Sequence, residues 1–60
     1  MNNGIIEHLE SVEIKVQQLT AIATVTGEAA EKVEHGTLAL CFQVIERLGR
    51  ECLLHIEQTE

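Results

Sequence analysis

The chain has 60 residues, with ten Glu, no Asp, two Lys and two Arg, and its formal net charge is −6 at pH 7. A chain this short forms one domain and buries only about 60% of the surface that it exposes when unfolded, so its stability is marginal or borrowed. Small scaffolds usually gain the missing stability from a disulfide, a metal or a partner chain. The acidic balance argues against binding to phosphate backbones or to anionic membranes. Neither a membrane span nor a signal peptide is predicted. We therefore expect a single domain over residues 1–60, in the cytoplasm, with reduced thiols.

An apolar ladder with steps of four and three residues runs along the first half of the chain. Its members are Ile5, Leu9, Val12, Val16, Leu19 and Ala23. This spacing predicts a helix whose apolar stripe packs lengthwise against other helices. Asn2 and Asn3 are candidate N-caps, so we expect the helix over residues 4–26. Residues 20–26 are rich in β-branched side chains, but a lone strand would have no partner in this chain, which favours helix there too.

Two glycines divide the next segment. Gly27 directly follows the ladder and predicts the end of the first helix. Residues 28–35 contain Glu, Ala and Lys and are followed by Gly36, which predicts a short middle helix. In the alternative, residues 27–36 form the opening turns of one long second helix, with Gly36 inside it at a cost of about 1 kcal/mol relative to Ala. The sequence favours the break.

The last helix is predicted over residues 37–58, with Thr37 as its N-cap. Its predicted core face consists of Leu38, Cys41, Phe42, Ile45, Leu48, Cys52, Leu53 and Ile56. Further apolar residues lie beside this face, so the apolar arc is wider than one hairpin partner can cover. Gly49 lies mid-helix, either as an ordinary surface glycine or where another backbone approaches closely. We predict an oligomer interface that includes Leu40, Phe42, Val44, Gly49 and Leu54.

The cysteines and histidines form no recognisable site. Cys41 and Cys52 are separated by roughly 16 Å along the last predicted helix, too far for a disulfide. Cys52, His55 and Glu51 are close in sequence, and His8 lies near them if the long helices are antiparallel. A zinc ion uses such groups, but Cys52 also belongs to the apolar ladder, where a thiol acts as a small hydrophobic residue. We predict no metal, no cofactor and no active site.

The charged residues are interpreted as solvated helix faces. Arg47 and Arg50 are flanked by glutamates, which favours an ion-pair network within the helix over nucleic-acid contacts. Glutamates three residues apart form two rows, Glu7, Glu10 and Glu13 in the first and Glu28, Glu31 and Glu34 in the second. Such rows can imitate a phosphate backbone, although a solvated face is the simpler interpretation. Glu28 and Glu31 also suit the start of the predicted middle helix.

The predicted fold is all-α, either a small helical hairpin or a three-helix chain, and it assembles as a helical bundle. A small helical hairpin of about this length is similar to the Rop-type hairpins, which dimerise into four-helix bundles and bind RNA. The similarity is one of pattern, and no function is carried over from it. We expect a non-enzymatic interaction protein that self-associates, with a dimer favoured. The alternatives are an acidic inhibitor or decoy that binds a basic protein surface and, less expected, a Rop-like nucleic-acid-binding dimer.

Overall fold

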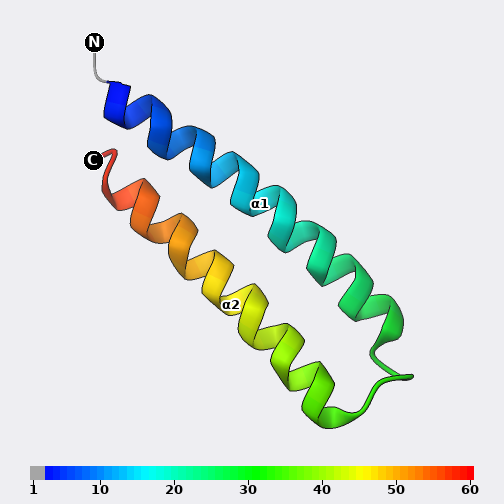
Figure 1. Cartoon of the computed structure of the whole chain (residues 1–60). Coiled ribbons are helices and arrows are strands. Elements are labelled where there is room, and N and C mark those ends of the chain that lie inside the picture. Colours follow the sequence, from blue (N-terminus) through cyan, green and yellow to red (C-terminus); the bar gives the residue numbers. More distant parts are fainter. Residues whose placement is uncertain (1–2) are drawn as a thin grey trace.

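The computed structural model describes residues 3–60, and this part of the chain contains two helices and no strand (Figure 1). α1 spans Asn3–Ala29 and α2 spans His35–Glu57. The helices run antiparallel, so the turn lies at one end of the molecule and both chain ends lie at the other. The all-α class and the helical hairpin are confirmed, and residues 20–26 are helical as predicted. The N-cap candidate Asn2 lies outside the described residues.

The predicted middle helix over residues 28–35 is wrong. α1 continues through Gly27 to Ala29, and a turn separates it from α2. No glycine among residues 3–60 has a positive φ, so Gly27 lacks the left-handed conformation with which a glycine ends a helix. An interior glycine costs about 1 kcal/mol relative to Ala, and the continued helix buries Thr26 within the hairpin. The alternative, in which residues 27–36 open the second helix, is also wrong.

The start of α2 differs from the prediction by two residues. Glu34, and not Thr37, precedes the helix, with an extended backbone at φ −66° and ψ 152°. The Leu38 N–H donates to the Glu34 carbonyl oxygen at 2.9 Å, which closes the first turn. The Glu34 side chain makes no capping hydrogen bond. The helix therefore begins without the side-chain cap that the sequence predicts at Thr37.

Two members of the second glutamate row, Glu28 and Glu31, do not lie at the start of a helix, whereas Glu34 directly precedes α2. Glu28 lies in the last turn of α1, and Glu31 lies in the turn between the helices. In this turn the Lys32 N–H donates to the Ala29 carbonyl oxygen at 2.8 Å. The predicted favourable position of Glu28 and Glu31 beside exposed amide groups is therefore wrong. A carboxylate at the carboxyl end of a helix faces the negative end of the helix dipole instead.

The helices meet along a seam of buried and half-buried residues at steps of three and four. On α1 the seam consists of Ile5, His8, Val12, Lys15, Leu19, Ile22 and Thr26, and on α2 of Leu38, Cys41, Ile45, Leu48, Cys52 and His55. The predicted α1 ladder is only partly confirmed, because Leu9, Val16 and Ala23 are exposed. The predicted core face of α2 is likewise too wide, because Phe42, Leu53 and Ile56 are exposed.

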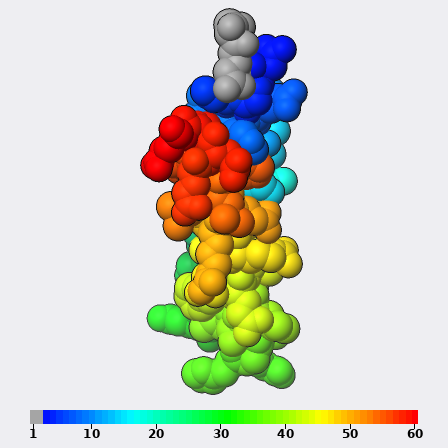
Figure 2. Space-filling view, turned by 90° about the vertical axis from the view of Figure 1, so that its left-hand side faces the viewer, coloured from blue at the N-terminus to red at the C-terminus, as the bar shows by residue number. Residues whose placement is uncertain are grey.

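The hairpin is a narrow rod with little interior. Figure 2 shows its elongated outline, whose principal extents are 49 × 15 × 11 Å. The radius of gyration is 14.1 Å, whereas a compact domain of this length has about 10 Å. Among residues 3–60, Leu48, Cys52 and Thr26 alone are buried, and none of them completely. Neither helix has a stretch that is long and apolar enough to cross a membrane.

Candidate interaction surface

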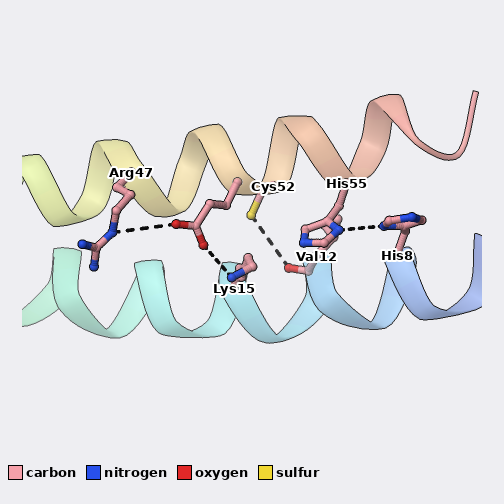
Figure 3. A network of polar contacts seen from close by, with 7 residues as sticks. His8, Val12, Lys15, Arg47, Cys52 and His55 are labelled. Atoms are coloured by element: carbon pink, nitrogen blue, oxygen red, sulfur yellow. Dashed lines mark hydrogen bonds and ion pairs between the residues drawn. The ribbon is translucent and has the colours of Figure 1, made fainter.

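Charged side chains of both helices meet in the seam (Figure 3). Lys15 Nζ donates to Glu51 Oε1 at 2.6 Å, and Arg47 Nε lies 3.8 Å from Glu51 Oε2. The hydrogen bond from Lys15 is the main reason that the pKa of Glu51 lies below its usual value, and the charges of Lys15, Arg47 and His55 lower it further against partial desolvation. Glu51 therefore stays ionised at neutral pH and links α1 to α2.

His8 and His55 pair across the seam, nearer the chain ends. Their Nδ1 atoms are 2.7 Å apart, and their ring centroids are 5.0 Å apart with a tilt of 45°. Each nitrogen of a neutral imidazole either donates or accepts. In this contact the ring that donates carries a proton on Nδ1, and the Nδ1 of the ring that accepts carries none. The expectation that His8 lies close to His55 is confirmed.

Cys52 does not join the two histidines. Its Sγ donates to the Val12 carbonyl oxygen at 4.0 Å (Figure 3). The thiol therefore contributes to the contact between α2 and α1. Within residues 3–60, no three His, Cys, Asp or Glu side chains lie together in a way that could hold a metal ion. Cys41 and Cys52 are both free thiols on α2. The structure thus brings together the histidines that the sequence singled out but not the cysteine beside them.

The charged residues outside the seam lie on solvated faces. Arg50 Nη2 lies 3.3 Å from Glu46 Oε2, and this contact and the Arg47–Glu51 contact confirm the predicted ion pairs within the last helix. All six glutamates of the two predicted rows are exposed. The glutamates therefore form open helix and turn surfaces around the hairpin.

The exposed apolar residues divide between the two flanks of the seam. On each helix, the residue four positions after every second seam residue lies about 75° to one side of the middle of the seam. Because the helices are antiparallel, the same rotation brings both sets to the same flank. We name this set the apolar strip. It consists of Leu9, Val16, Ala23, Phe42, Gly49 and Ile56.

The strip residues of the two helices lie level with one another. The contacts between His8 and His55 and between Val12 and Cys52 fix which residues of the two helices are level with each other. From the chain ends to the turn, this register places Leu9 level with Ile56, Val16 with Gly49 and Ala23 with Phe42. All six positions are uncharged. The flank thus carries a row of uncharged residues on each helix, with the exposed carboxylates of Glu13 and Glu46 beside the rows.

The opposite flank is interrupted. Towards the turn it has an open apolar depression of about 290 Å³, lined by Ala21, Ile22, Val25, Thr26 and Cys41. Away from the turn, the ion pairs of Glu51 with Lys15 and Arg47 border the same flank. The depression has no convergent set of polar groups to orient a small ligand. The depression occupies only the half of this flank near the turn, and Ile14 and Leu54 add exposed apolar side chains beyond it.

The five predicted interface residues do not share one face. Phe42 and Gly49 lie in the apolar strip, whereas Leu40, Val44 and Leu54 lie on the opposite flank. Leu9, Val16 and Ile56 were predicted to lie in the core and are exposed instead. A recurrence of exactly seven residues, at 9, 16 and 23 and at 42, 49 and 56, is the signal that identifies them. Comparisons of the chain with protein-family models, with curated proteins and with solved structures give no match.

Proposed function

We propose that this chain is a non-enzymatic helical interaction protein that works as a self-associated assembly, with a dimer favoured. The observation that supports this proposal most strongly is that the hairpin has many more exposed than buried apolar side chains. Among residues 3–60, ten large apolar side chains are exposed and only three residues are buried. Exposed apolar surface on this scale is typical of an interaction site, and a chain of this size needs further burial to be stable.

The surface area supports the same proposal. The chain exposes 4704 Å², about 800 Å² more than the roughly 3,900 Å² expected for a compact monomeric protein of this mass. A standard protein interface buries about 800 Å² on each partner. One interface of ordinary size would therefore bring the exposed area of each chain down to the value for a compact protein.

Sedimentation equilibrium at micromolar concentration, at low and at high salt, tests the proposal. We expect a species heavier than the 6.7 kDa chain. We also expect association to tighten as salt rises, because salt screens the repulsion between two chains of net charge −6. A folded monomer at every salt concentration would contradict self-association. If that monomer instead captured a basic protein and released it at high salt, the acidic decoy would replace our proposal.

A further inference from the structure

We propose that the apolar strip is the surface on which a second copy of this chain docks, which pairs two hairpins into a four-helix bundle. This inference rests on the self-association proposed above and names the surface that performs it. Its occupant is another copy of the same chain, with the strip of one hairpin against the strip of the other. The two strips form an isologous interface, in which both copies use the same residues.

Charge favours the strip over the opposite flank. Charged residues make up 23% of the chain, yet none occupies a strip position. The opposite flank is bordered by the ion pairs of Glu51 with Lys15 and Arg47. Covering these pairs would remove ionised groups from water, and their mutual attraction often fails to repay that cost. The strip positions carry no ionised group, and the carboxylates beside them, Glu13 and Glu46, are exposed at its outer edge.

Shape favours a second hairpin as the occupant. Both helices direct apolar residues to the same flank, so the strip is two helices wide and about 21 Å long between its end residues. A second hairpin offers a face of the same width and length, and helices pack lengthwise in this way in four-helix bundles. A standard protein interface buries about 800 Å² on each partner. This equals the area by which the exposed surface of the chain exceeds that of a compact protein. A copy of this chain therefore fits both the dimensions and the area.

Gly49, in the middle of the strip and level with Val16, is compatible with a second chain at this surface. A Cβ atom built at Gly49 would meet no other atom of the hairpin within 4 Å. An interior helical glycine costs about 1 kcal/mol relative to Ala, so the hairpin alone gains nothing from a glycine there. A second chain that packs on the strip does gain, because the missing side chain lets its helix approach closely.

Two matched pairs of full-length variants test the surface by sedimentation equilibrium, with circular dichroism as the measure of folding. Val16 is 45% exposed on the strip and Ile14 is 55% exposed on the opposite flank of the same helix. Phe42 and Leu40 form the corresponding pair on α2, at 55% and 62% exposed. We expect Val16→Glu and Phe42→Glu to raise the dissociation constant of the dimer more than tenfold. Ile14→Glu and Leu40→Glu should leave it within about threefold of wild type.

A third pair separates loss of the dimer from loss of the fold. Gly49→Gln places a good helix former where the hairpin has room for it. It should therefore weaken the dimer while helicity at high protein concentration is kept. Gly36→Gln makes the same change at an exposed position in the first turn of α2, and it should leave the dimer intact. Loss of the dimer in both glycine variants would contradict a specific role for the strip.

The outcomes keep the two proposals apart. If the wild-type chain is a folded monomer, self-association fails and the docking surface fails with it. If the wild type associates but only Ile14→Glu and Leu40→Glu dissociate it, self-association stands and the strip is overturned. If all four glutamate variants dissociate it, both flanks are needed and a dimer closed through the strip is overturned. Dissociation by the strip variants alone supports the inference.

Discussion

At the scale of single residues, Glu51 couples the stability of the hairpin to pH. Its pKa is lowered, first by the hydrogen bond from Lys15, so the folded chain binds this proton less readily than the unfolded chain does. The resulting stabilisation is present above the unfolded pKa of about 4.3 and is lost as pH falls through the lower folded pKa. Glu51→Gln should therefore lower the thermal unfolding midpoint at pH 7, and the difference from wild type should disappear towards pH 3.

Glu46→Gln is the control for this pH dependence. Glu46 contacts Arg50 within α2, and both side chains are largely exposed. An exposed ion pair of this kind contributes little to stability, so the variant should follow the wild-type midpoint closely at every pH. A Glu51→Gln deficit of the same size at pH 3 as at pH 7 would show that the lost contribution is packing rather than charge.

The residue-level contacts divide into those that a sequence can predict and those that it cannot. The Arg47–Glu51 and Arg50–Glu46 contacts follow from a spacing of four residues on one helix. The Lys15–Glu51 contact joins residues 36 apart in the chain. It depends on the register between the helices, which no local pattern specifies. The polar cluster in the seam was therefore only partly predictable.

At the scale of elements, Gly27 decides between two helices and three. It lies inside α1 without a positive φ, and a Cβ atom there would meet nothing within 4 Å. Gly27→Ala should therefore stabilise the protein by about 0.5 to 1 kcal/mol, measured as a higher thermal midpoint. Gln17→Gly, at an exposed position of the same helix, should lower it. A loss of stability in Gly27→Ala would mean that the helix ends at this residue.

The same glycine shows why the elements were only partly predictable. Both long helices follow from apolar periodicity, but a glycine after a periodic run looks the same in sequence whether the helix stops or continues. Its effect depends on φ, and here the following residues keep the helical φ and carry the helix to Ala29. Burial of Thr26 in the last turns supplies a tertiary reason that the propensity scale does not contain.

At the scale of the whole molecule, the apolar arc of each helix is wider than the seam. The sequence gives the width of this arc, because the ladder and its neighbours can be counted on a helix. It does not specify which part of the arc faces the other helix of the same chain. In the structure the seam takes Ile5, Val12 and Leu19 and leaves Leu9 and Val16 outside. The excess of apolar surface over what one hairpin can cover was therefore predictable, whereas the residues that stay exposed required the structure.

The central claim is that the folded hairpin depends on a second chain, and the most direct test is the thermal unfolding midpoint, followed by circular dichroism, as a function of protein concentration. Folding coupled to association makes this midpoint depend on concentration. Over about a hundredfold range of concentration, the midpoint of the wild-type chain should rise steadily. A cooperative midpoint that stays constant over the same range would contradict the claim, because it would show that one chain folds alone.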